Sequence, residues 1–165
     1  MDPRLPRAIA AMAALVRADM ANPVTPEAPT TTVSEATRQA MAVATQLTRG
    51  PGGAHAIRSG EWHAPAASAL DRLLCAVPIG IAMSTLDPEA LADTVWAACG
   101  CTTRNEFQAA ALLATAVSLS IEPRDIHLVE AVQIVSAMTP RGEPEDGPDV
   151  LTATRLALNF QANSV

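Results

Sequence analysis

The chain has 165 residues, enough for one domain, and its residues are 49% hydrophobic and 17% charged, which excludes disorder over most of its length. All 11 basic residues are arginines that stand singly along a chain of net charge −6, so neither a nucleic-acid-binding surface nor a membrane-surface helix is expected. Alanine is abundant and aromatic residues make up only 2%. This composition predicts an all-α protein, a compact bundle of about seven helices.

The apolar residues of 5–21 recur at spacings of three and four, which is typical of an amphipathic helix. Thr32 and Glu35 have the spacing of a capping box and predict a second helix over about 32–48. Residues 50–66, which contain several glycines and prolines, are predicted to form a long central loop.

Five further helices are expected to begin near residues 67, 88, 104, 123 and 148. Pro78 is expected to kink or restart the first of them. Asp87-Pro88 is an N-cap followed by proline, and Thr103 with Glu106 is a second capping box. Residues 139–148 form a loop rich in proline, glycine and acid, the one plausible hinge in a single domain spanning 1–165.

The N-terminus lacks the pattern of a signal peptide, and no segment has the length of a membrane span. We therefore expect a cytoplasmic protein with reduced cysteines. Cys99 and Cys101 are interpreted as two small buried apolar residues rather than a redox or metal pair. His127 is interpreted as a residue at the boundary of an apolar stripe, without a chemical role.

The central loop carries the main concentration of polar and aromatic side chains in an aliphatic protein, namely Arg58, Glu61, Trp62 and His63. Loops on a rigid scaffold often hold functional residues, so this cluster is a candidate site. The alternative is a compact loop in which Trp62 packs on the core as a plug. His55 and His63 lack a third ligand and make a weak metal site.

Several segments, taken in order, share a pattern with a known family. Residues 7–24 match an opening helix that ends in Gly-Asp-Ala-Leu-Gly and Pro-Val, with Asp19 at its aspartate. Residues 74–80 (LCAVPIG) match Met-Arg-x-x-Pro-Ile-Gly and are followed by 87–91 (DPEAL), a frequent continuation. Thr102-Thr103 stands near a Thr-His pair ahead of an alanine-rich helix. In this order and spacing the chain resembles the ADP-ribosylglycohydrolases.

That family binds two metal ions, usually magnesium, through a Thr-Asp-Asp-Thr segment and a later Asp-x-Asp-Thr segment. The first would fall on 34–37 (SEAT), where Glu35 and Thr37 would be remnants, and the second has no counterpart here. Cys75 stands where the family has arginine. Two magnesium ions need several converging oxygen ligands, so we expect neither a metal nor a cofactor.

The resemblance and these departures predict a shortened, degenerate ADP-ribosylglycohydrolase-like protein that acts as a non-hydrolytic binding or assembly protein. A shortened bundle is expected to expose an apolar face, which predicts a homodimer or a complex with a partner protein. A small-molecule ligand is the other kind of partner considered. No nucleic acid or membrane is expected as a partner.

Two enzyme hypotheses stay open beside it. One is a metal-free enzyme with a repurposed pocket, in which His63 would serve as general acid or base near neutral pH. The other is a residual ADP-ribosyl hydrolase completed by a partner chain. A generic helical bundle is the remaining alternative. The candidate pocket residues are Asp19, Glu35, Thr37, Arg58, Trp62, His63 and Arg72.

Overall fold

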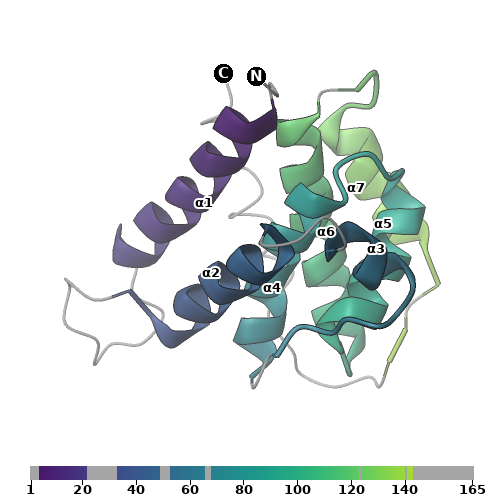
Figure 1. Cartoon of the computed structure of the whole chain (residues 1–165). Helices are drawn as coiled ribbons and strands as arrows, with labels where there is room; N and C mark the ends of the chain where they lie inside the picture. The colour runs from purple at the N-terminus through teal and green to yellow at the C-terminus, as the bar shows by residue number, and fades with distance from the viewer. Residues whose placement is uncertain are drawn as a thin grey trace.

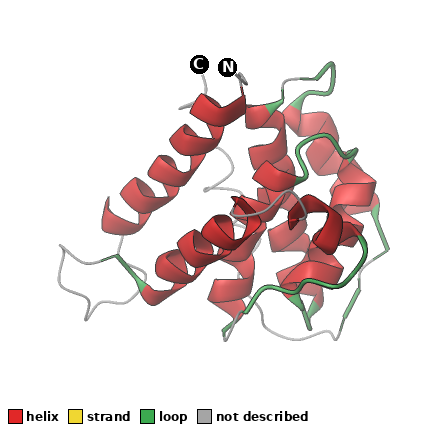
Figure 2. Ribbon diagram, in the orientation of Figure 1, coloured by secondary structure: helices red, strands yellow, loops and turns green. Residues whose placement is uncertain are grey.

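The computed structural model describes residues 4–21, 33–48, 53–65, 68–122, 124–139 and 141–142. Within these ranges the chain is all-α and has no strand, as predicted (Figures 1 and 2). Its helices are α1 (Arg4–Ala21), α2 (Glu35–Thr48), α3 (Gly53–Arg58), α4 (Ala69–Ala82), α5 (Pro88–Cys99), α6 (Arg104–Ile121) and α7 (Leu128–Ala137).

The helices α4 and α6 form the centre of the molecule. α6 is buried along nearly its whole length, and half of its positions are alanine, valine or leucine. Arg72 contacts Glu106 and Gly80 contacts Ala114, each pair 34 residues apart, so α4 and α6 run parallel. α2 and α1 lie on one side of this pair, and α5 and α7 lie on the other (Figure 1).

Local capping signals set the starts of the central helices. The Thr103 hydroxyl accepts the Glu106 amide and the Glu106 carboxylate accepts the Thr103 amide, as the predicted capping box requires. The Asp87 carboxylate accepts the Ala90 amide at the start of α5, also as predicted. Gly100 ends α5 in the left-handed conformation, with φ of 65°.

Two predicted boundaries in the first half are wrong. α2 begins at Glu35 rather than near Thr32, because the Ser34 hydroxyl accepts the Thr37 amide and caps the helix there. The predicted 50–66 loop contains the short helix α3, which packs Ile57 into the core. Gly53 makes this packing possible, since a Cβ there would lie 2.5 Å from the Leu47 carbonyl oxygen.

In the second half, Pro78 does not restart a helix: α4 runs through it to Ala82, and Pro78 itself is buried. α7 begins at Leu128 rather than at Pro123, with His127 as its N-cap residue. His127 is exposed, as its interpretation as a boundary residue implies. The helix predicted from residue 148 lies outside the described residues.

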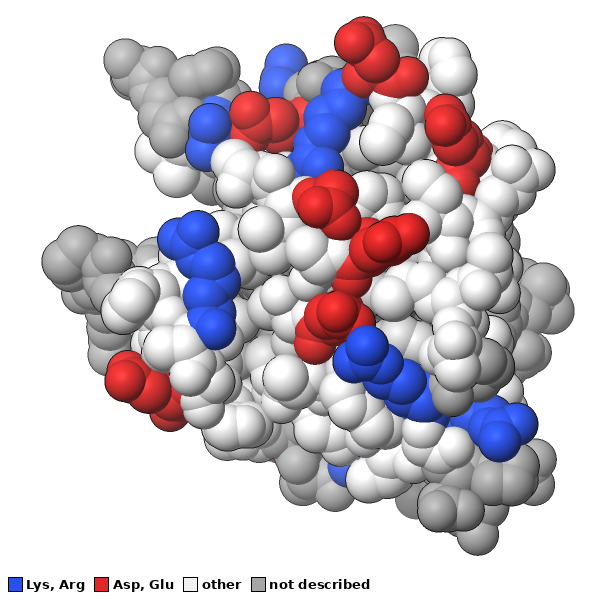
Figure 3. All heavy atoms as spheres, turned by 90° about the vertical axis from the view of Figure 1, so that its right-hand side faces the viewer, with Lys and Arg blue, Asp and Glu red and all other residues white. Residues whose placement is uncertain are grey.

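The face over α5 and α7 carries acidic and arginine side chains in interspersed positions rather than in one patch of a single sign (Figure 3). Arg141 pairs with Asp93 there, at 2.6 Å. Among the described helices none has both the length and the apolar character needed to cross a membrane.

Candidate functional site

Asp19 and Thr37 both contact Ser34 at the N-terminus of α2. The Asp19 carboxylate is 7% exposed, and its Oδ2 accepts the Ser34 backbone amide at 2.6 Å. The Ser34 hydroxyl lies 3.3 Å from the hydroxyl of Thr37, which is fully buried. Oδ1 of Asp19 is buried and has no hydrogen-bond partner among the described residues. This aspartate therefore ties the end of α1 to the start of α2.

The family pattern would place a two-metal site here, and the residues present do not fit it. Glu35 points into solvent, where it pairs with Arg38 at 2.5 Å. Among the described residues Asp19 is then the one carboxylate of this cluster, and two ions need several carboxylates that converge. Across the described residues no three His, Cys, Asp or Glu side chains are grouped so that they could hold a metal ion.

We expect Asp19→Asn to leave stability unchanged or to raise it by up to about 1 kcal/mol, because the amide oxygen still accepts from Ser34 while a buried charge is removed. Asp19→Ala is expected to destabilise by about 1–3 kcal/mol, since the Ser34 amide loses its acceptor. Urea denaturation of the two variants measures both effects. A loss for Asn as large as that for Ala would contradict this account.

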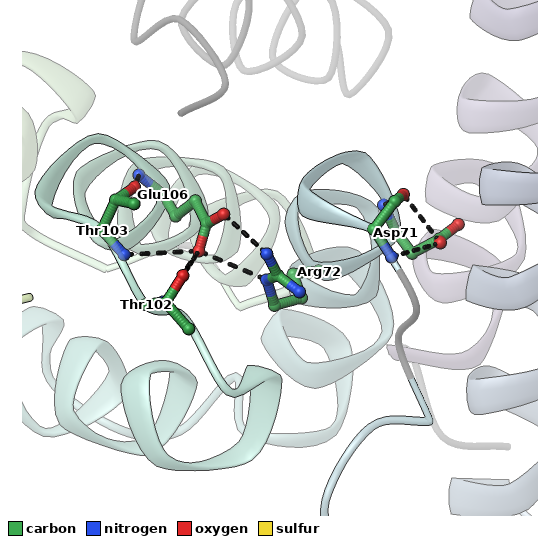
Figure 4. A network of polar contacts seen from close by, with 6 residues as sticks. Asp71, Arg72, Thr102, Thr103 and Glu106 are labelled. Atoms are coloured by element: carbon green, nitrogen blue, oxygen red, sulfur yellow. Dashed lines mark hydrogen bonds and ion pairs between the residues drawn. The ribbon is translucent and has the colours of Figure 1, made fainter. Parts of the chain in front are cut away.

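Arg72 lies in a second, separate polar network (Figure 4). Its guanidinium makes two hydrogen bonds to Glu106, from Nη2 to Oε1 at 2.7 Å and from Nε to Oε2 at 3.2 Å. Oε2 also accepts the Thr102 amide at 2.7 Å and the Thr102 hydroxyl at 3.1 Å. Glu106 is 4% exposed, so this network joins the N-termini of α4 and α6 inside the protein.

The ionisation of this pair follows from its contacts. Burial alone would raise the pKa of Glu106, but the hydrogen bonds from Arg72 and Thr102 outweigh burial and lower it. The same hydrogen bond raises the pKa of Arg72. A carboxylate that accepts this many donors is held as an anion, so Glu106 serves structure rather than proton transfer. The Thr103–Glu106 spacing predicted the helix cap, but no feature of the sequence predicted that Arg72 would pair with Glu106.

The remaining candidates lie away from both networks. Arg58 and His63 are exposed, and Arg58 donates to the Ala54 carbonyl of its own helix. Trp62 is half-buried and packs against the core. The loop after α3 is held to α5, because the Ala64 amide donates to the Ala98 carbonyl at 2.7 Å. The structure therefore links Asp19 and Thr37 through Ser34, while Arg72 pairs elsewhere and Glu35, Arg58 and His63 face solvent.

The three cysteines lie in the core. Burial raises the pKa of Cys75 and of Cys101 to about 12, and it raises that of Cys99 as well. These thiols are protonated at neutral pH and are weak nucleophiles. They pack as small apolar residues, as expected for Cys99 and Cys101.

An apolar groove of about 460 Å³, here called the α1 groove, runs between α1 and the layer of α2, α3 and α4. Every described residue that lines it is apolar, including Leu5, Ile9 and Met12 of α1 and Pro78 and Ile81 of α4. Leu5 and Ile9, one turn apart at its edge, are 57% and 61% exposed. An exposed apolar face was expected, but no sequence feature located it at α1.

Comparisons of this chain with protein-family models, with curated proteins and with solved structures find no match. The relation to the ADP-ribosylglycohydrolases therefore stays a prediction that rests on the order of its motifs.

Proposed function

We propose that this chain is a non-hydrolytic binding or assembly protein, a degenerate relative of the ADP-ribosylglycohydrolases, that holds an amphipathic helix of a partner protein in the α1 groove. The observation that carries the proposal is the groove itself. A volume of about 460 Å³ lies within the range of ligand-binding pockets, and the described residues of its lining offer apolar contacts without a polar group to direct chemistry.

The shape of the groove favours a helix as its occupant. Helices α1 and α4 form its two walls, and Leu5 and Ile9 stand at one rim with the spacing of successive helical turns. A helix laid between them would bury these side chains as a third helix of the layer, in the manner of groove-binding helices. Burying the exposed part of two such side chains contributes on the order of 2 kcal/mol.

The charge of α1 specifies the chemistry of the partner further. Arg4, Arg7 and Arg17 are all exposed, and the single acid of α1, Asp19, is buried. Arg4 pairs with Glu122 at 3.1 Å and Arg7 donates to the Ile121 carbonyl, so Arg17 carries most of this argument. A partner helix with acidic residues beside its apolar stripe therefore complements this surface. A homodimer is the variant of this proposal in which the partner is a second copy.

Photolabelling tests the groove. The probe is a synthetic acidic amphipathic helix of about five turns, with leucines at spacings of three and four and one photoreactive diazirine side chain. We expect labels on α1, α2 and α4 around Ile9. Ile9→Asp should remove most of this labelling, because it places a charge in the apolar contact.

Val129→Asp is the matched control for Ile9→Asp, since Val129 is 69% exposed on α7, away from the groove. It should leave the labelling pattern unchanged. Labels spread over the surface without preference for the groove would contradict the proposed function. Light scattering of the same samples shows whether a second copy is the partner, because the mass would then double.

A further inference from the structure

Helix α1 lies at the edge of the bundle (Figure 1), and its two halves are attached to the other helices in different ways. From Ala11 onward its inner face is buried, and Leu15 belongs to the hydrophobic core. Over residues 4–10 every side chain is exposed except that of Ala8, which is half-buried. The first two turns therefore bury little apolar surface, and segments of this kind open at a low free energy.

Polar contacts with the end of α6 hold these first two turns in place. The Arg7 guanidinium donates to the Ile121 carbonyl at 3.0 Å, at the negative end of the α6 dipole. Arg4 pairs with Glu122 at 3.1 Å, and these two side chains are 47% and 34% exposed. Ion pairs in contact with water contribute little stability, so these contacts can break without unfolding the protein.

The opposite end of α1 is fixed more firmly. Oδ2 of Asp19 accepts the Ser34 amide at 2.6 Å, and the carboxylate is buried. Releasing this end would leave the Ser34 amide without its acceptor and would open the core around Leu15. Both losses exceed the loss of a surface ion pair. α1 therefore has one end that can be released and one end that stays fixed.

The size of the α1 groove requires a movement if a whole helix is to enter it. An α-helix with its side chains is about 10 Å across, so three turns with a length of about 16 Å fill roughly 1,300 Å³. The groove has a volume of about 460 Å³. This space takes side chains of an occupant, whereas a whole helix needs α1 to lie further from α2 and α4.

We propose that α1 is a hinged wall of the α1 groove: its first two turns swing outward to admit an occupant, while its other end stays fixed at Leu15 and Asp19. The contacts of Arg4 and Arg7 with the end of α6, here called the α1 latch, keep the wall closed when the groove is empty. The inference rests on the proposed function of the groove, and it adds how access to that site is controlled.

Thiol labelling measures the movement without an occupant. Ala11 on the inner face of α1 is 5% exposed and Cys101 is 6% exposed, so the two positions are equally covered in the closed protein. We expect the thiol of Ala11→Cys to react with dithiodipyridine, a neutral reagent, at least about tenfold faster than the three native cysteines, because those are reached only by wider unfolding. Ala14→Cys, also on the inner face, should react in the same way and serves if Ala11→Cys does not fold.

The α1 latch is tested through the rate of the same thiol. Arg7→Met removes the donor to the Ile121 carbonyl and keeps an aliphatic side chain, so the thiol of Ala11→Cys should react about fivefold faster. Glu122→Gln weakens the surface pair with Arg4 and should speed the reaction about twofold. Arg17→Met is the matched control, because Arg17 is an exposed arginine of α1 outside the latch, and it should leave the rate unchanged.

The distance between two spin labels shows whether an occupant moves the wall. Ala10→Cys on α1 and Gln46→Cys on α2 both place a label at an exposed position, while the native cysteines are buried. Adding the synthetic acidic helix should lengthen this distance by about 5 Å or more, because packed helices need about 8–10 Å between their axes. A label at Met20→Cys, near the fixed end, should move relative to Gln46→Cys by about 2 Å or less.

The outcomes separate the hinged wall from the proposed function. Equal rates for Ala11→Cys, Ala14→Cys and the native cysteines overturn the hinged wall and leave the proposed function standing. A rate that Arg17→Met raises as much as Arg7→Met overturns the latch. Groove labelling without a longer label distance overturns the outward swing, again with the proposed function intact. Absence of groove labelling overturns the proposed function and the admission of an occupant, and the thiol rates then decide the movement of α1 by themselves.

Discussion

Replacing Gly80 with alanine is expected to destabilise the protein by about 3 kcal/mol, at the upper end for overpacking of a core. A Cβ at this position would lie 2.5 Å from the carbonyl oxygen of Ala114 and 3.0 Å from its Cα. Both neighbours are backbone atoms of a buried helix, so no side chain can rotate away. α4 and α6 would have to separate, and their contact is the most extensive between any two described helices.

The sign of this effect is informative, because replacing glycine with alanine inside a helix otherwise stabilises the helix by about 1 kcal/mol. Urea denaturation of Gly80→Ala, monitored by far-ultraviolet circular dichroism, measures the net loss. Gly100→Ala is the control, since a Cβ there meets nothing within 4 Å and only the left-handed backbone, at φ 65°, opposes it. We expect Gly100→Ala to destabilise the protein by about 1 kcal/mol. A stable Gly80→Ala variant would mean that the helices are not in close contact.

Glu106→Gln is expected to destabilise the protein by about 3 kcal/mol, because it leaves the Arg72 guanidinium without its charged partner inside the protein. The value is at the low end for a buried ion pair, since 19% of the Arg72 side chain stays exposed and can be hydrated. Glu35→Gln is the matched control, because the Glu35–Arg38 pair lies in solvent. It should change stability by about 0.5 kcal/mol or less. Equal losses for the two variants would contradict the structure.

The Arg72–Glu106 pair also predicts that the free energy of unfolding depends on pH. Because contacts with Arg72 and Thr102 lower the pKa of Glu106 in the folded chain, the unfolded chain binds its proton first as the pH falls. The contribution of Glu106 is therefore complete above the ordinary glutamate value of about 4.3 and is lost as the pH falls through the lowered pKa. Urea denaturation between pH 7 and pH 3 should show a steeper acid loss in the native chain than in Glu106→Gln.

Local sequence signals were enough for the helices whose ends are made by neighbouring residues. Asp87 with Pro88, and Thr103 with Glu106, place the starts of α5 and α6, because a cap is satisfied within one turn. The alanine content determined the all-α class for the same reason: helix propensity acts residue by residue. Burial of Cys99 and Cys101 was likewise foreseeable from their place beside apolar positions.

Contacts between distant segments were decided by the tertiary structure alone. α3 has only six residues and is too short to be stable by itself. It forms because it packs on α2 and α5, and this packing could not be predicted from the sequence. Pro78 stays inside α4 because neighbouring helices hold that segment, which the local rule for proline ignores. The seven candidate pocket residues were chosen by residue type and by motif, and neither says which side chains a fold brings together.

By itself, the sequence determined the helical class, several caps and the burial of Cys99 and Cys101, because propensity, capping and burial are properties of short stretches of chain. Only the tertiary structure paired Arg72 with Glu106, set Gly80 against Ala114 and opened the groove beside Ile9. Each of these joins segments more than 30 residues apart. Their approach depends on how all the helices pack at once, and no local pattern records it.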